Sequence, residues 1–252
     1  MISKKSDWYK KGWTLNIKQQ SWTEDTKRQV DFLIDTLSLK GGERILDLAC
    51  GFGRHSLELA RRGFGVIGID ITEDYIKYAA AQAKKENLNA QFFRMDIRDV
   101  SFKNEFDVVL NMADGAIGYL ENDSENLKIF DAAAKALKSG GRHFMDIMNA
   151  DYADSHFPCN LWDAGREKLT LSKFEWDKKS RIMLYGQNDF AYGEPLNVPE
   201  FEKGDPIRLY NINEIEQIMR NRKMRVVKTF GDFSGAICDE NSIQMMVVSQ
   251  KN

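Results

Sequence analysis

The chain has 252 residues and a formal net charge of -2, so it lacks the overall positive field that attracts nucleic acid or anionic membranes. Hydrophobic residues make up 42% and charged residues 29%, an ordinary balance for a globular protein that needs neither disulfides nor metal ions to build a core. The three scattered cysteines (Cys50, Cys159 and Cys238) form no disulfide framework and no metal-binding pair. We expect no bound metal, no secretory signal, no membrane span and a cytoplasmic location.

Helix and strand signals alternate from about residue 23 to residue 150. Val30, Leu33, Ile34 and Leu37 form an apolar helix stripe, which the glycines at 41–42 end. Strands are expected at 44–48, 65–70, 91–95, 106–112 and 142–148, and helices at 54–62, after Thr72 as N-cap, and at 124–137. Such alternation predicts right-handed crossovers and a mostly parallel sheet of the doubly wound, Rossmann-like α/β type. Ligands of these sheets bind at the carboxyl ends of the strands.

The pattern changes after about residue 150. Two longer strands, 169–176 and 181–192, are joined by a polar turn and predict an antiparallel hairpin. Three of the four prolines follow shortly afterwards and predict irregular chain. A helix over 212–222, with Asn213 as its N-cap, precedes two final strands at 224–230 and 243–249.

A tight turn follows the first strand, in the run Asp47-Leu48-Ala49-Cys50-Gly51-Phe52-Gly53. Glycines there let a ligand approach the backbone without an intervening side chain. Asp70 ends the next strand, where a carboxylate accepts hydrogen bonds from ribose hydroxyls. These features alone are compatible with a nicotinamide or flavin cofactor, but Ser56 replaces the third glycine of that motif. The charge of Asp47 would also oppose a pyrophosphate, whereas it suits the ammonium group of an amino-acid cofactor.

With these residues the chain resembles the class I S-adenosylmethionine-dependent methyltransferases. The first motif of that family is matched by residues 47–53, with Ala49 in place of the more usual first glycine. Its later motifs are matched by Asp70, by Asp96-Ile97, by 106–111 and by 137–141. The resemblance implies a methyltransferase enzyme that uses S-adenosylmethionine and releases S-adenosylhomocysteine. It also implies a seven-stranded, mostly parallel sheet that ends with an antiparallel strand pair.

The same resemblance implies which residues hold the cofactor. Asp47 would face the ammonium group, Asp70 the ribose, and Asp96 with the backbone N–H of Ile97 the adenine. The full set of expected cofactor contacts is Asp47, Ala49, Gly51, Gly53, His55, Asp70, Ile71, Asp96, Ile97, Asn111 and Met112. Some of these residues have a purely structural alternative to cofactor contact. Asp96 could be the first residue of a loop, and His55 could be an ordinary helix residue.

Three short segments, Gly-Arg-His at 53–55, Gly118-Tyr119 and Gly231-Asp232-Phe233, look similar to bacterial small-molecule methyltransferases with a β-rich lid. This similarity implies a cofactor domain over 1–150 and 207–252 and a lid insert over 151–206. The aromatic residues within 1–22 either form a flap over the site or only pack a terminal segment. Acceptor contacts are expected after strands that end at the same edge or in the lid, at Tyr119, Asn149 and Trp162.

Methyl transfer to an N or O atom requires alignment and desolvation, and a hydroxyl acceptor benefits from a general base. No histidine–carboxylate pair indicates such a base, and Tyr119 and His156 are the weak candidates. We expect a small-molecule acceptor rather than nucleic acid, because residues 111–114 lack the Asn/Asp-Pro-Pro-Tyr motif of amino-methylating DNA enzymes. A nicotinamide-dependent oxidoreductase and a non-catalytic S-adenosylmethionine-binding protein are the alternatives. Monomer and homodimer both stay open.

Overall fold

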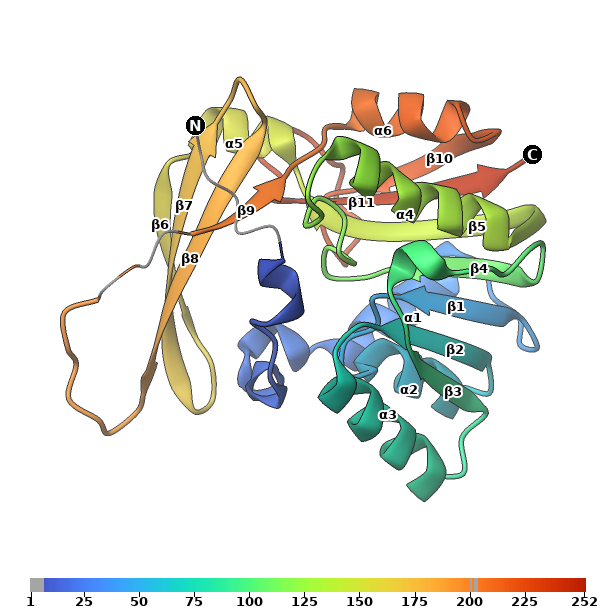
Figure 1. The fold of residues 1–252 in the computed structure, drawn as a ribbon, viewed down its shortest axis with the longest axis horizontal. Helices are drawn as coiled ribbons and strands as arrows, with labels where there is room; N and C mark the ends of the chain where they lie inside the picture. Colours follow the sequence, from blue (N-terminus) through green and yellow to red (C-terminus); the bar gives the residue numbers. More distant parts are fainter. Residues whose placement is uncertain (1–6, 200, 202–203) are drawn as a thin grey trace.

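The larger part of the chain forms a seven-stranded sheet in the order β3-β2-β1-β4-β5-β11-β10 (Figure 1). Neighbours from β3 to β5 are parallel, whereas β11 is antiparallel to both β5 and β10. The computed structural model describes residues 7–199, 201 and 204–252. The strands are β1 (Arg44–Leu48), β2 (Gly65–Asp70), β3 (Ala90–Arg94), β4 (Phe106–Asn111), β5 (Leu137–Met148), β10 (Met224–Phe230) and β11 (Gln244–Lys251). This confirms the doubly wound, Rossmann-like sheet with its terminal antiparallel pair.

Helices cover both faces of this sheet. Because neighbouring residues of a strand point to opposite faces, Ile45 of β1 packs with Leu59 on one side, and Leu46 packs with Phe130 and Ile215 on the other. The first face is covered by α1 and α2, with α3 beside them over β2 and β3, and the second by α4 and α6. The helices are α1 (Thr26–Thr36), α2 (Arg54–Arg61), α3 (Glu73–Lys85), α4 (Asp123–Ala136) and α6 (Ile212–Arg220).

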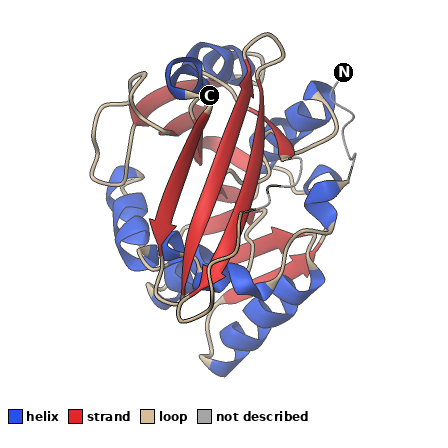
Figure 2. Ribbon diagram, turned by 90° about the vertical axis from the view of Figure 1, so that its left-hand side faces the viewer, coloured by secondary structure: helices blue, strands red, loops and turns tan. Residues whose placement is uncertain are grey.

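A second, antiparallel sheet of four strands stands to one side of the first, and we call it the lid sheet (Figures 1 and 2). Its strands are β6 (Cys159–Ala164), β7 (Lys168–Asp177), β8 (Ile182–Ala191) and β9 (Asp205–Arg208). Phe174, Met183 and Ile207 form a small core with Ala153 of α5 (Ala150–His156). The predicted hairpin is β7–β8. The sequence did not predict α5, β6 and β9, and β9 continues past the expected end of the insert at residue 206.

The N-terminal segment, residues 7–25, lies between the two sheets (Figure 1). It contains three 3-10 helices, η1 (Trp8–Lys10), η2 (Leu15–Gln19) and η3 (Ser21–Thr23). The Tyr75 hydroxyl of α3 donates to the carbonyl of Thr14 over 3.0 Å, and Ser21 donates to Asp163 of β6. The segment therefore contacts both parts of the molecule, as a flap would, although a flap role stays a prediction. Residues 1–6 of the expected flap lie outside the described residues.

Three local details differ from the sequence-based prediction. β5 begins at Leu137, and Gly140-Gly141 forms a bulge inside it, because Phe106 pairs with Leu137 and Val108 with Arg142. The N-cap of α6 is Asn211, not Asn213. Asn211 and Glu214 form a capping box in which each side chain accepts the backbone N–H of the other. Thr72 occupies the N-cap of α3, but its side chain forms no capping hydrogen bond.

Within the part of the chain that the structure describes, no helix combines the length and apolar character needed to cross a bilayer.

Candidate active site

The chain turns sharply between β1 and α2, at the carboxyl edge of the parallel strands. Ala49, Gly51 and Gly53 have positive φ angles of 55°, 58° and 79°. The N–H of Cys50 donates to the carbonyl of Ile69 over 2.9 Å, which ties the turn to β2. A Cβ atom on Gly51 would meet nothing within 4 Å, so open space borders the backbone there. A ligand at this turn has direct access to the main chain.

Asp47 is buried at the end of β1, with an exposed fraction of 1%. Its Oδ2 atom accepts a hydrogen bond of 2.5 Å from the Ser56 hydroxyl, while its Oδ1 atom is buried and has no partner among the described residues. Burial raises the pKa of Asp47 to about 7, against the lowering effects of Ser56 and Arg54. A buried carboxylate oxygen without a donor is costly unless a ligand supplies one. Asp47 is therefore poised for a cationic group.

Arg54 is a candidate that the sequence analysis missed, although it stands in the quoted Gly-Arg-His run. Its guanidinium donates to Thr26 (3.0 Å) and Gln29 (2.5 Å), and it lies over the Trp22 ring, 5.2 Å from the centroid. Burial lowers the pKa of Arg54 to about 10, opposed by Asp146 and Asp47. A cation close to Asp47 suits the carboxylate end of an amino-acid ligand.

His55 does not face the turn as expected. It is buried, and its Nε2 atom lies 2.8 Å from the Gln29 side-chain oxygen of α1. Burial lowers the pKa of His55 well below its ordinary value, so the ring is neutral. The structure gives it the ordinary helix role, because position 55 of α2 faces α1.

Asp70 ends β2 with both carboxylate oxygens engaged by backbone. Oδ2 accepts the N–H of Gly51 (2.9 Å) and Oδ1 the N–H of Thr72 (2.8 Å). Burial is the main influence on the pKa of Asp70 and raises it. The Thr72 side chain and the backbone of Ile71 also interact with this carboxylate, so a ligand hydroxyl would use an acceptor position that these donors leave. Ile71, the next residue, is partly buried, and its carbonyl accepts from Arg94 (3.2 Å).

The Asp96 carboxylate makes more hydrogen bonds within the protein than the sequence suggests. It caps the 3-10 helix η4 (Ile97–Asp99) by accepting the N–H of Arg98, and the Arg98 guanidinium forms an ion pair of 2.5 Å with it. Arg98 is the main reason that the pKa of Asp96 is lowered. Ile97 is buried. Asp96 therefore does act as the first residue of a loop. An adenine contact would use the one acceptor position of its carboxylate that Arg98 leaves.

The comparisons with known proteins find methyltransferases. Residues 45–141 match the family model described as a methyltransferase domain. A putative methyltransferase of Geobacillus sp. (strain WCH70) is 23% identical over 84% of this chain and 86% of its own length. A ubiquinone biosynthesis O-methyltransferase of Xylella fastidiosa (strain M23) is 32% identical over 50% of this chain and 49% of its own length. An S-adenosylmethionine-dependent methyltransferase of Clostridium acetobutylicum superimposes with a TM-score of 0.74 at 18% identity, covering 90% and 92% of the two chains.

Residues 45–141 match a methyltransferase domain, and the comparisons together support a class I S-adenosylmethionine-dependent methyltransferase.

The residues of this methyltransferase fit its cofactor. We propose that the unpartnered Oδ1 atom of Asp47 accepts the ammonium group, that Arg54 faces the carboxylate group, and that the turn at Gly51 borders the ligand. Asp70 is proposed for the ribose and Asp96 with Ile97 for the adenine. The oxidoreductase alternative, which needs a pyrophosphate beside Asp47, is set aside.

Cofactor affinity should depend on pH through Asp47. Ligand binding needs the ionised carboxylate, whose pKa in the free protein is about 7, whereas an α-ammonium stays protonated below that pH. We therefore expect the Kd of S-adenosylhomocysteine to fall about tenfold between pH 5.5 and 7, as measured by calorimetry. The groups facing Asp47 are Ser56, Arg54 and Asp70, and Arg54 stays charged throughout. An affinity that is constant, or weaker at pH 7, would contradict this role for Asp47.

The loop after β4 has an unusual backbone. Ala113, Asp114, Gly115 and Ala116 all have positive φ angles, between 51° and 67°. The left-handed region costs roughly 1–2 kcal/mol per non-glycine residue, and such strain gathers at functional sites. Asn111 holds this left-handed turn, because its amide donates to the carbonyl of Gly115 over 2.9 Å.

Asn111 and Met112 are therefore buried supports of that loop. The side-chain oxygen of Asn111 lies 3.0 Å from the Nε2 atom of His143, itself buried in β5. Since an amide oxygen only accepts, His143 carries its proton on Nε2. Both polar groups of the Asn111 side chain are thus engaged within the protein, in the contacts to Gly115 and His143. The sequence pattern marks the strand end but not which way its side chains point.

Asp114 and Tyr119 are joined by a hydrogen bond in the chain that follows β4. The Tyr119 hydroxyl donates to Oδ2 of Asp114 (3.0 Å), and the N–H of Met148 donates to Oδ1 (3.2 Å). Burial raises the pKa of Asp114, and it also raises the pKa of Tyr119 together with the Asp114 charge. Tyr119 is thus a neutral donor that orients Asp114, not a base. Asp146 of β5 lies nearby, and burial with the Asp114 charge raises its pKa to about 7.

Three expected acceptor or catalytic residues lie elsewhere. Asn149 caps α5, and its amide donates to the carbonyls of Asp239 and Ser242. His156 is exposed, stacked on Tyr152 with ring centroids 4.0 Å apart. Trp162 is 71% exposed and pairs with Leu171, on the opposite face of the lid sheet from buried Phe174. Their sequence positions were compatible with the site. In the structure, Asn149 is used as a helix cap, His156 lies at an exposed helix end, and the register of β6 places Trp162 on the other face of the lid sheet.

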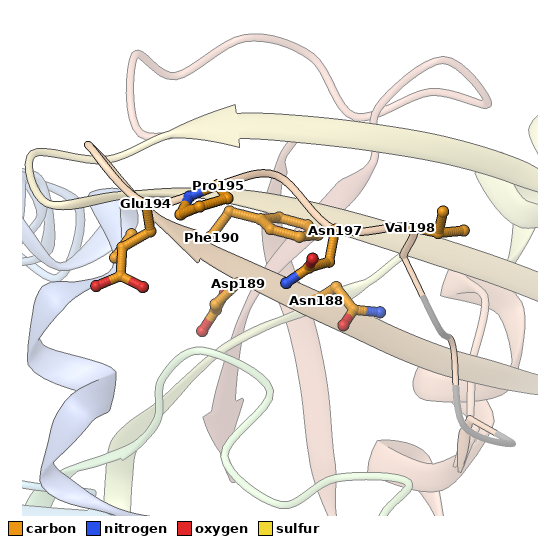
Figure 3. A pocket seen from close by; sticks show the side chains of 8 residues that line it. Asn188, Asp189, Phe190, Glu194, Pro195, Asn197 and Val198 are labelled. Atoms are coloured by element: carbon orange, nitrogen blue, oxygen red, sulfur yellow. The ribbon is translucent and has the colours of Figure 1, made fainter.

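A hollow of about 390 Å³ lies outside this site, between the end of β8 and the chain that follows it (Figure 3). It is lined by Asn188, Asp189, Phe190, Ala191, Glu194, Pro195, Asn197 and Val198. It contains none of the residues predicted for cofactor or acceptor.

Proposed function

We propose that this methyltransferase transfers the methyl group of S-adenosylmethionine to an N or O atom of a small molecule. The acceptor is held between the edge of the seven-stranded sheet and the inner face of the lid sheet. The sulfonium supplies an activated methyl group with a good leaving group, so the protein mainly aligns the acceptor, excludes water and handles a proton.

One observation supports this location above all. Tyr119, beside Asp114 at the sheet edge, packs both against the main core and against the small core of the lid sheet. On the facing sheet, Tyr185 lies close enough to Tyr119 for the two hydroxyl groups to interact electrostatically. The inner row of the lid sheet is polar, since Ser172, Tyr185 and Gln187 are linked by hydrogen bonds of 3.3 and 2.7 Å. Polar groups enclosed in this way suit a small polar molecule.

The N-terminal segment completes the enclosure. Trp8 and Trp13 pack on Tyr119, with ring centroids 5.0 and 6.2 Å from it. The segment is also fastened to the lid sheet, because Thr170 donates to Gln20 over 3.3 Å. A site covered on two sides excludes water from the transfer, which favours an acceptor small enough to be enclosed.

The test is turnover with a metabolite library. The full chain is incubated with S-adenosylmethionine and pools of small molecules, and S-adenosylhomocysteine is measured together with the mass of the product. We expect formation with one small-molecule class and a product heavier by one methyl group. Ribosomal RNA and bulk protein serve as controls. Methylation of these macromolecules, with none of the small molecules, would refute the proposal.

A further inference from the structure

We infer that the acceptor is an amine, which arrives as an ammonium cation and gives its proton to Asp114. The inference rests on the proposed function and names its substrate class. The supporting observations are the carboxylates near Tyr119, the aromatic rings around it and the geometry of Asp114.

Four carboxylates belong to the region where the two sheets face each other. Asp114 and Asp146 lie at the edge of the main sheet and influence each other electrostatically, while the charge of Arg54 partly offsets that of Asp146. Asp205 of the lid sheet influences Tyr119, and Asp189 influences Tyr185. Among the described residues of this lid face, Lys168 is a cation that is already paired with Asp189, at 2.5 Å. Such a field attracts a positive acceptor and opposes a negative one.

Aromatic faces reinforce the preference for a cation. Tyr119 is nearly parallel to Trp13, with an angle of 8° between the rings, and tilted by 42° to Trp8. Tryptophan and tyrosine faces attract ammonium groups, and a carboxylate beside the rings adds to the attraction. The indole nitrogen of Trp8 is also buried without a hydrogen-bond partner among the described residues. A polar atom of the acceptor, next to its amine, would satisfy this donor.

The same charges argue against a hydroxyl acceptor. A hydroxyl becomes a strong nucleophile by losing its proton, and the resulting oxyanion would stand beside Asp114 and Asp146. Neighbouring like charges disfavour that anion. An ammonium needs only to become a neutral amine, which removes a positive charge and places no negative charge on the acceptor.

Asp114 is placed to receive that proton. Its two oxygens accept one hydrogen bond each, from Tyr119 and from the N–H of Met148, so lone pairs remain on both. The left-handed turn, held by Asn111, fixes its position. In the step, an N–H bond breaks and the proton moves to Asp114. The nitrogen lone pair then forms the N–C bond while the C–S bond breaks, and its electron pair goes to sulfur, giving the neutral thioether.

The test uses the full chain with S-adenosylmethionine and pairs of compounds that differ only in amine against hydroxyl, such as glucosamine with glucose and phenethylamine with 2-phenylethanol. S-adenosylhomocysteine formation and, separately, calorimetric binding of each compound to the S-adenosylhomocysteine complex are measured. We expect binding and turnover with amines and not with their hydroxyl partners. Asp114→Asn should lower kcat/KM for the best amine about 10²–10³-fold and leave cofactor affinity within about twofold.

Tyr119→Phe keeps the ring and removes the donor, so a loss of about tenfold is expected, and this variant stands in if Asp114→Asn fails to fold. Asp35→Asn, which alters an exposed carboxylate of α1, should behave as the unaltered protein. Turnover of hydroxyl compounds but not amines, turnover of neither class, or an Asp114→Asn variant with more than half the activity would overturn the inference. The proposed function is overturned as well only if ribosomal RNA or protein is methylated and no small molecule of either class is.

Discussion

Asp47→Asn is expected to weaken S-adenosylhomocysteine binding at least about 100-fold while leaving the melting temperature unchanged or higher. The carboxylate is buried, and its Oδ1 atom has no donor in the free protein. Removing one member of a buried charge pair costs roughly 3–5 kcal/mol in the complex. In the free protein the same substitution removes a buried charge whose Oδ1 atom has no donor among the described residues, so the free energy of unfolding falls little.

Calorimetry tests the expected loss of affinity, and thermal unfolding tests the expected unchanged or higher melting temperature. Ser56→Ala is the matched control, because it removes the hydrogen bond to Asp47 but keeps the charge. We expect it to weaken binding by less than about tenfold. If Asp47→Asn destabilises the fold and leaves affinity unchanged, Asp47 is a structural residue of the turn.

Gly118→Ala is expected to lower the melting temperature by about 5–15 °C, because the free energy of unfolding falls by roughly 2–4 kcal/mol. Gly118 has a φ of 89°, and an added Cβ would overlap the backbone carbonyl of Arg208 in β9. The Gly118 carbonyl also accepts the N–H of Arg208 over 2.9 Å. The substitution therefore disturbs the place where the loop after β4 meets the lid sheet.

The control for this prediction is Gly193→Ala. Gly193 has a similar φ of 86°, but a Cβ there would meet nothing within 4 Å. It carries only the cost of the left-handed backbone, roughly 1 kcal/mol. Because the cofactor turn lies elsewhere, Gly118→Ala should reduce methyl transfer much more than cofactor affinity below its melting temperature. Equal melting temperatures for the two variants would show that the contact with Arg208 does not constrain the fold.

The cofactor half of the fold was predictable because its signals are local. Apolar runs at fixed spacing marked β1, β2 and β4, and the turn beside Asp47 and the carboxylate of Asp70 lie within a short stretch of chain. The capping box of α6 is equally local, but the rule that a Glu follows three residues after the cap fits both Asn211 with Glu214 and Asn213 with Glu216, so it does not single out Asn211.

The acceptor side was not predictable because its roles depend on distant partners. Asn149 is occupied by carbonyls about ninety residues further along the chain. Trp162 faces outward only because β6 pairs with β7 in one particular register. The short strand β9 contains Pro206, a residue that argues against a strand in sequence analysis. Asp114 belongs to no motif, and the left-handed turn that positions it is invisible in the residue types alone.

The central claim is that the buried carboxylate after β1 receives the ammonium group of the cofactor. Calorimetric comparison of S-adenosylhomocysteine with its desamino analogue, which lacks only that group, tests it most directly. We predict that the parent compound binds at least about 100-fold more tightly at pH 7, and that the difference vanishes in Asp47→Asn. Equal affinity of the two compounds for the unaltered protein would contradict the account.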